Sequence, residues 1–132
     1  MRLFLLLVTL LLSAPAAFAD AEVYFISPQN GDTVSGEFGV RFGLRGMGVA
    51  PAGVDAANTG HHHLLIDVEV LPPLDVPLPK TEHVRHFGGG QTETTLNLAP
   101  GTHTLQLLLG NYSHVPHNPP VLSEKITITV SE

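Results

Sequence analysis

The chain has 132 residues, with six basic residues, twelve acidic residues, eight histidines and no cysteine, and its net charge is −6 with histidine neutral. This acidic balance, without a basic run, argues against nucleic acid or an anionic membrane surface as the partner. The lack of cysteine excludes disulfides, thiolate metal ligands and a cysteine nucleophile.

Residues 1–19 have the pattern of a secretory signal peptide. Arg2 supplies the positive start, residues 3–12 form a short apolar run, and Ala17-Phe18-Ala19 resembles a cleavage site. The apolar run is too short to span a bilayer, and no later segment is long and apolar enough to do so. We therefore expect a chain cleaved after Ala19, exported to a bacterial periplasm, and forming one domain over residues 20–132.

The remaining sequence predicts short strands separated by clusters of glycine, proline, asparagine and aspartate. Alternating apolar or β-branched residues mark six strands, at 22–27, 37–44, 61–70, 92–98, 102–109 and 121–130. The segment around 80–87 is expected to add a degenerate strand. Residues 46–60 and 110–120 are expected to be loops, and 71–81, with its four prolines, an extended crossover. The fold class predicted is all-β, an immunoglobulin-like antiparallel β-sandwich of about seven strands.

The histidines all follow position 60, and in such a sandwich most of them would lie at one end. Seven are expected where strand 61–70 begins: His61, His62, His63, His83, His86, His114 and His117. His103 begins a strand at the opposite end. We expect it to be structural, with its ring hydrogen-bonded to the backbone of the preceding turn.

The strand at 61–70 divides its histidines between two faces. Alternation places His61 and His63 on one face, and His62 with Leu64 and Ile66 on the other. The second set is the more apolar, so His62 is expected at the mouth of the core. His61 and His63 lie close enough to bind one ion together.

A histidine cluster without cysteine points to a transition metal, because imidazole is the commonest protein metal ligand. Imidazole with an optional thioether suits copper, zinc or nickel and disfavours magnesium and calcium. Copper is the first expectation for an exported protein, and zinc the second. The expected ligands are His61, His63, His114 and His117 first, then His62, His83 and His86, with Met47 as a soft ligand and Asp67 and Glu93 as hydrogen-bond partners of the ligands.

The same residues also have structural interpretations. The run at 61–63 can form a hydrogen-bonded cluster at a strand start, the other histidines can be solvated rings, and Met47 can be an apolar contact. The alternative function is therefore a non-enzymatic interaction module for an envelope protein or glycan, whose histidines form a hydrogen-bond network. We do not expect an enzyme, because the chain lacks G-x-S-x-G, H-E-x-x-H and a phosphate-binding loop.

Several motifs together resemble one known family. They are YFISP at 24–28 with GDTV at 31–34, GMGVAPAGVD at 46–55, HHHLLID at 61–67, HFGGGQTET at 86–94, PGTHTLQLLLGN at 100–111 and HVPHNPPVLSEKITITV at 114–130. On these motifs the chain resembles domain-of-unknown-function family 4399, small exported bacterial proteins. The resemblance covers essentially all of residues 20–132. It implies export and a single domain, and it implies no particular activity.

Overall fold

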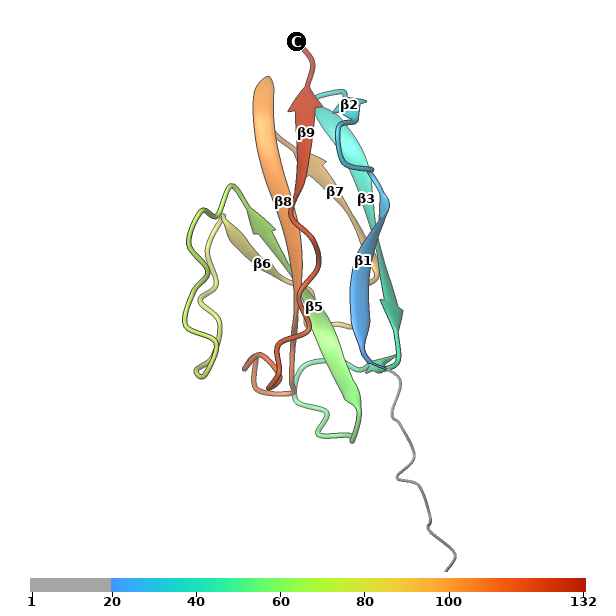
Figure 1. Ribbon diagram of the computed structural model, residues 1–132, viewed down its shortest axis with the longest axis vertical. Coiled ribbons are helices and arrows are strands. Elements are labelled where there is room, and N and C mark those ends of the chain that lie inside the picture. The colour runs from blue at the N-terminus through green and yellow to red at the C-terminus, as the bar shows by residue number, and fades with distance from the viewer. Residues whose placement is uncertain (1–19) are drawn as a thin grey trace, which may run out of the picture.

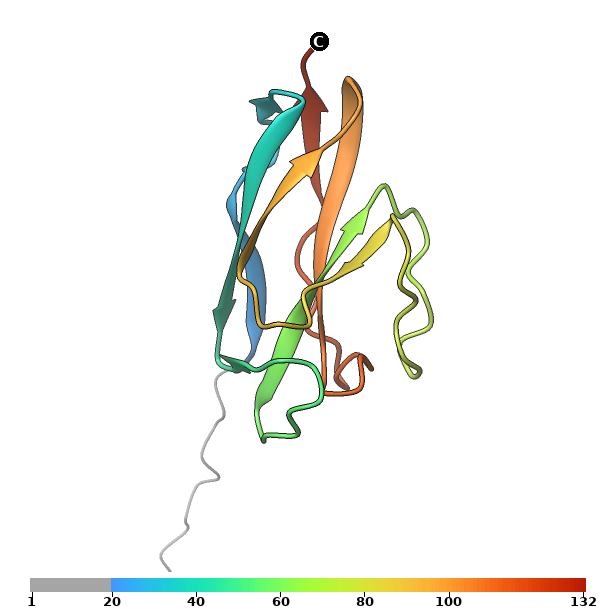
Figure 2. The ribbon, with the colours of Figure 1, turned by 180° about the vertical axis from the view of Figure 1, so that it is seen from behind.

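The computed structural model describes residues 20–132, so the expected signal peptide at 1–19 lies outside the described residues. Within residues 20–132 the regular secondary structure is all strand. Figures 1 and 2 show the strands in two layers. They are β1 (Glu22–Ser27), β2 (Thr33–Val34), β3 (Glu37–Arg45), β4 (Gly48–Val49), β5 (Thr59–Ile66), β6 (Val84–His86), β7 (Glu93–Asn97), β8 (Gly101–Gly110) and β9 (Ile126–Val130).

The strands form two sheets that face one another across the main core. One sheet has the order β1-β3-β7, and the other has the order β2-β9-β8-β5-β4, with β6 paired to β5. Alternation along each strand sends every second side chain inward. The most deeply buried members of this core are Val40, Leu64, Leu96, Leu105, Leu107, Leu109 and Ile128.

Two strands are shorter than the sequence pattern predicts, and each has a local reason. β5 ends at Ile66 instead of residue 70, because Asp67 adopts a left-handed backbone with φ of 55°. β9 begins at Ile126 instead of residue 121. Before it, the Ser123 hydroxyl accepts a hydrogen bond from the Leu107 amide (2.8 Å), a position where a regular ladder would use a backbone carbonyl.

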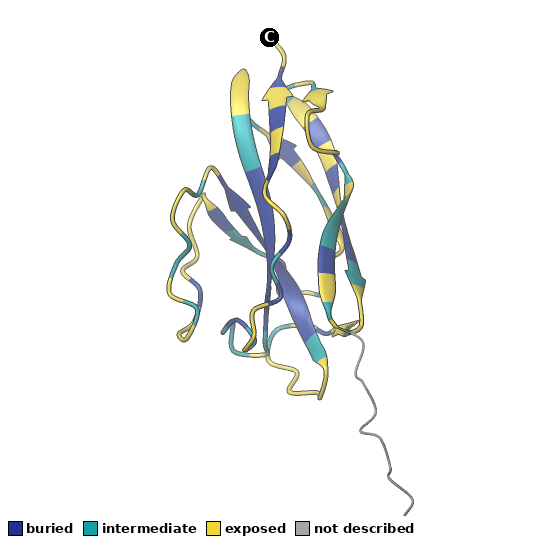
Figure 3. Ribbon diagram, viewed as in Figure 1, coloured by how far each residue is buried: buried dark blue, intermediate teal, exposed yellow. Residues whose placement is uncertain are grey.

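A proline-rich flap, residues 68–83, covers the face of β5 that points away from the main core. Leu78 of the flap packs with Leu65, Val84 and Leu108 in a second, smaller core. Figure 3 shows the resulting continuous burial along the middle of β5 and β8. Both faces of β5 are therefore buried, and a side chain on either face leaves water.

The loops at 46–58 and 111–120 lie at the end of the molecule where β5 begins, opposite the C-terminus (Figures 1 and 2). This is the end at which the histidines are expected. The described residues include no helix long and apolar enough to cross a membrane.

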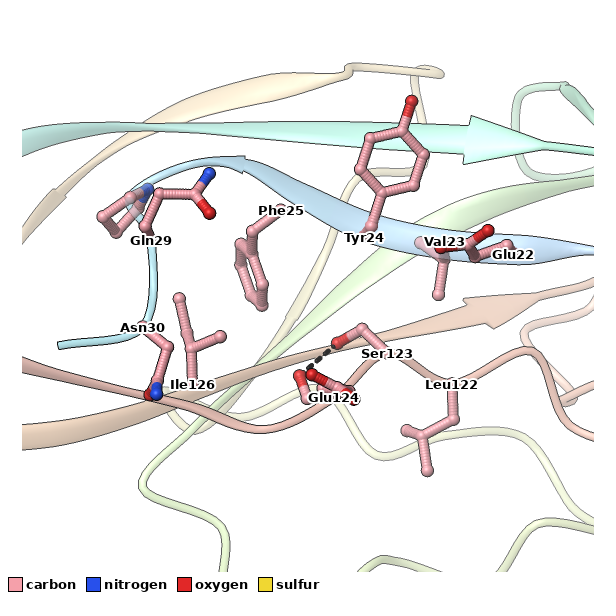
Figure 4. Close-up of a pocket in the computed structure, with 11 residues that line it drawn as sticks. Glu22, Val23, Tyr24, Phe25, Gln29, Asn30, Leu122, Ser123, Glu124 and Ile126 are labelled. Atoms are coloured by element: carbon pink, nitrogen blue, oxygen red, sulfur yellow. Dashed lines mark hydrogen bonds between the residues drawn. The ribbon is translucent and has the colours of Figure 1, made fainter. Parts of the chain in front are cut away.

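A groove of about 330 Å³ lies between β1 and the segment at 122–126, where the edges of the two sheets separate. Figure 4 shows Phe25 and Ile126 pointing toward one another across it. Its eleven lining residues include no histidine, so the groove is separate from the cluster described next.

Candidate metal centre

Four histidine side chains, His61, His63, His86 and His114, come together beneath the flap and are called here the histidine cluster. Their ring centroids are 4.6 Å apart for His61–His63, 4.4 Å for His63–His86, 4.8 Å for His86–His114 and 4.8 Å for His61–His114. One ring nitrogen from each of His61, His63 and His114 lies within 4.8 Å of the other two. The four rings thus form a closed circuit, and three of them can offer nitrogen to one ion.

Strand register explains how three of these rings meet. His61 and His63 are two residues apart on β5 and so share a face. β6 pairs with β5 in a register that sets His86 opposite His63. His114 has a left-handed backbone with φ of 66°, and its carbonyl accepts a hydrogen bond from the Leu78 amide of the flap (2.9 Å). The flap and the 111–120 loop therefore hold each other around the cluster.

The cluster also requires a glycine beside it. A Cβ on Gly110 would lie 2.5 Å from Cε1 of His63, closer than real Cβ atoms come, and a tight 3.1 Å from its Nδ1. Gly110 pairs with His61 across the β5–β8 ladder, so it sits at the floor of the cluster. The missing side chain is what leaves room for the His63 ring.

Backbone carbonyls and neighbouring rings determine which nitrogens carry protons. His86 Nε2–H donates to the carbonyl of Pro79 in the flap (3.0 Å), which leaves the Nδ1 lone pair of His86 free. His61 Nε2 and His114 Nδ1 share one hydrogen bond of 3.0 Å. Metal-binding histidines commonly fix their second nitrogen on a backbone carbonyl in the way His86 does.

The two β5 histidines of the cluster are fully buried with unused nitrogens. His61 and His63 each have 0% of their surface exposed. Nδ1 of His61 and both ring nitrogens of His63 have no hydrogen-bond partner. A buried polar atom without a partner costs about 1–3 kcal/mol, so these atoms are expensive unless something binds them.

Burial disfavours the charged form of three rings in the cluster, His61, His63 and His86. It lowers the pKa of His61 to about 4, with further lowering from the charges of His114, His86 and His117. Burial likewise lowers the pKa of His63 to about 3, with further lowering from the other cluster histidines and an opposing effect from the Leu108 backbone. The pKa of His86 is lowered too, first by burial. Neutral imidazoles keep their lone pairs, which is the state that metal binding requires.

His62 lies on the opposite face of β5, in the main core. Its ring centroid is 5.1 Å from that of Phe42, its exposure is 0%, and both of its nitrogens lack partners. Burial, and then the charge of His61, lowers its pKa to about 4. The sequence places His62 on the core face correctly, but the sheet separates it from the cluster.

His117 and Met47, two further expected ligands, also lie outside the cluster. His117 Nε2–H donates to the carbonyl of Thr59 (3.1 Å), and its Cε1 lies 2.8 Å from where a Cβ on Gly60 would be. It belongs to no three-nitrogen group, although its charge reaches His61. Met47 packs against the main core. From this loop the structure brings His114 into the three-nitrogen group, and the expectation that His117 is a first-rank ligand stays a prediction.

The other expected partners are engaged elsewhere. His83 lies opposite the end of β5, and its Nδ1–H donates to the carbonyl of Ile66 (2.9 Å). Three residues separate it from His86, and an odd spacing along extended chain sends the two side chains to opposite faces. Glu93 pairs with Arg41 on the other sheet (3.2 Å). These partners place neither residue in the three-histidine group, and the expectation that they serve the cluster stays a prediction.

Asp67 serves His103 instead of the cluster. His103 Nδ1–H donates to Asp67 (2.7 Å) and its Nε2–H donates to the carbonyl of Ala99 (2.8 Å). Both partners can only accept, so the ring is fully bonded when it is cationic, and the hydrogen bond to Asp67 is the main cause of its raised pKa. His103 fastens the turn before β8 to the end of β5.

The sequence does not predict two groups that shape the cluster, the Pro79 carbonyl that accepts from His86 and the glycine at position 110 beneath His63. The four prolines of 71–81 were a signal of a stiff segment, but nothing in their spacing shows that it folds over β5. A glycine followed by a turn gives no sign that a ring lies above it. Both contributions depend on contacts between distant parts of the chain.

These features define a class: an all-β protein of two sheets with a buried, all-histidine cluster able to hold a metal ion. Residues 40–131 match the family model described as "Domain of unknown function (DUF4399)". The match covers well over half of the chain, which therefore belongs to this family, as its motifs indicate. The comparison with curated proteins gave no match, nor did the comparison with solved structures.

Proposed function

We propose that this protein is a periplasmic, non-catalytic module that binds a transition metal, first copper and second zinc, for storage, delivery or sensing. One observation carries the proposal. Nitrogens of His61, His63 and His114 lie within 4.8 Å of one another, beside a flap that hydrogen-bonds to the His114 carbonyl and to the His86 ring. Three imidazoles are a sufficient donor set for copper or zinc, and His86 stands beside them as a fourth.

The alternative, a hydrogen-bond network that supports an envelope interaction surface, accounts less well for the same atoms. A network would give each buried ring a donor and an acceptor. Among the described residues, the cluster contains one hydrogen bond between rings, the His61–His114 contact of 3.0 Å. His63, which is fully buried, has no hydrogen bond of normal geometry at either nitrogen, although the Leu108 backbone lies near enough to raise its pKa. A bound ion would supply the missing partner.

Two further inferences, one about location and one about fold type, accompany the proposal. The signal-peptide pattern of residues 1–19 supports export. We propose that the fold is immunoglobulin-like. Strand β1 belongs to one sheet and β2 to the other, and the two sheets enclose one main core.

The test is direct measurement of metal on the untagged mature protein. Metal content after purification from the periplasm, and titrations with Cu(I), Cu(II) and Zn(II), would be compared between wild type and the double variant His63→Ala/His114→Ala. We expect one ion per chain in wild type and none in the double variant. His83→Ala is the matched control, because it removes an accessible histidine outside the cluster. Failure of every metal to bind more tightly than micromolar would rule the proposal out.

A further inference from the structure

The histidine cluster has no negative charge to balance a bound cation. In residues 20–132, the charges that act on the pKa values of His61, His63 and His86 come from other histidines and from Lys80. The two carboxylates that the sequence offered are occupied elsewhere: Asp67 holds His103 and Glu93 holds Arg41. The only three-ligand group in the described chain is composed of histidine alone.

Two rings of the cluster are shielded from the water that would otherwise screen a charge, while His86 and His114 are half-buried. His61 and His63 have 0% of their surface exposed, and Leu65, Leu78 and Leu108 build the apolar layer beside them. Transferring an ion from water into an apolar enclosure costs free energy that rises with the square of its charge. A divalent ion therefore meets about four times the penalty of a monovalent ion at a site like this one.

Ligation by imidazole repays part of this penalty, as three-histidine zinc sites show, but a neutral ring brings no counter-charge. Imidazole binds copper and zinc alike, and among divalent ions the usual order places Cu(II) above Zn(II). A thiolate or carboxylate would neutralise part of a divalent charge, but the chain has no cysteine and the cluster has no carboxylate. Charge, more than ligand preference, is then the property on which this site can discriminate.

We propose, on the basis of the proposed metal-binding function, that the cluster selects a monovalent soft cation, Cu(I), over Cu(II) and Zn(II). Three nitrogens from His61, His63 and His114 suit Cu(I), a d¹⁰ ion with no directional demand from its d electrons; because Zn(II) is also d¹⁰, the discrimination between these two ions rests on charge. His86 lies at the rim, where Lys80 adds a further positive charge. The site thereby disfavours divalent ions for an electrostatic reason.

The experiment measures affinities for four probes by competition with chelators of known strength: Cu(I) under anaerobic reducing conditions, Ag(I) as a redox-inert monovalent ion, Cu(II) and Zn(II). We expect Cu(I) and Ag(I) to bind one per chain and at least tenfold more tightly than Zn(II), a difference of about 1.4 kcal/mol. We also expect Cu(I) to bind at least tenfold more tightly than Cu(II). The double variant His63→Ala/His114→Ala loses all four, and His83→Ala retains them.

A pair of variants at the rim isolates the charge effect. His86→Asp and His86→Asn both remove the ring and its hydrogen bond to Pro79; they are nearly isosteric and differ chiefly by one negative charge. Relative to His86→Asn, His86→Asp should shift the Zn(II)-to-Ag(I) affinity ratio toward Zn(II) by at least tenfold. Circular dichroism and thermal unfolding establish that both variants fold.

The outcomes separate this inference from the function on which it rests. If Zn(II) or Cu(II) equals Cu(I) in affinity while the double variant loses it, the proposed function stands and the selectivity is wrong. An equal ratio in His86→Asp and His86→Asn also overturns the charge argument. If no probe binds more tightly than micromolar, the metal-binding function itself is refuted.

Discussion

The most informative single substitution is His62→Leu, because it tests the description of β5 without touching the cluster. His62 is fully buried in the main core, and both of its ring nitrogens lack partners. An unsatisfied buried polar group costs about 1–3 kcal/mol, and leucine introduces none. We therefore expect His62→Leu to stabilise the metal-free protein by about 1–3 kcal/mol at pH 7. For a domain of roughly 100 residues, that raises Tm by about 4 °C or more.

The pH dependence supplies a second, independent magnitude. Burial lowers the pKa of His62 from its ordinary 6.5 to about 4 in the folded protein. Between these two values the unfolded chain binds the extra proton, so stability falls as the pH falls. This pH-dependent cost of burying His62 is absent above about pH 6.5 and is complete by about pH 4. At about 1.4 kcal/mol per pH unit, the loss is on the order of 3 kcal/mol.

The assay is urea unfolding of chelator-treated wild type and His62→Leu between pH 7 and pH 4. His61 and His63 titrate in both proteins, so the difference between the two curves isolates His62. The advantage of the leucine variant should widen as the pH falls. A variant that is destabilised by more than about 1 kcal/mol, with a gap that stays constant with pH, would refute the reasoning. That result would mean that the His62 nitrogens have a partner that leucine cannot replace.

Three further outcomes are expected. Asp67→Asn should lower the pKa of His103, which NMR titration measures. Because the native pKa is raised, the Asp67–His103 pair stabilises the folded protein at low pH and ceases to do so once the pH passes above that pKa. The variant should therefore lose about 1 kcal/mol of unfolding free energy at low pH. Gly110→Ala should displace the His63 ring, cost about 1–3 kcal/mol in unfolding free energy and weaken metal binding at least tenfold. Gly39→Ala, where a Cβ meets nothing within 4 Å, should do neither in the same assays. Metal at about one hundred times its Kd should raise the unfolding free energy by about 2.7 kcal/mol. Thermal or urea unfolding with and without metal measures this change, and unchanged stability would contradict specific binding to the folded state.

Local patterning was sufficient to predict most of β5 and one part of the cluster. Alternation alone assigns His61 and His63 to one face and His62 to the core, and the structure has this division. Alternation does not show that the other face is also buried. That burial depends on the flap, whose Leu78 joins Leu65 in the second core, and such a contact between distant segments has no local signature.

The two H-x-x-H motifs show most clearly why spacing must be judged together with secondary structure. In a helix, residues three apart lie on one side and can bind one ion together. In extended chain an odd spacing sends side chains to opposite faces, about 10 Å apart along the strand. His83 and His86 are separated in this way, and only His86 joins the cluster. His114 joins it as well, while His117 turns to the carbonyl of Thr59. In an all-β chain the H-x-H of β5 is thus the better indicator of a shared ligand set, and each H-x-x-H contributes a single ring.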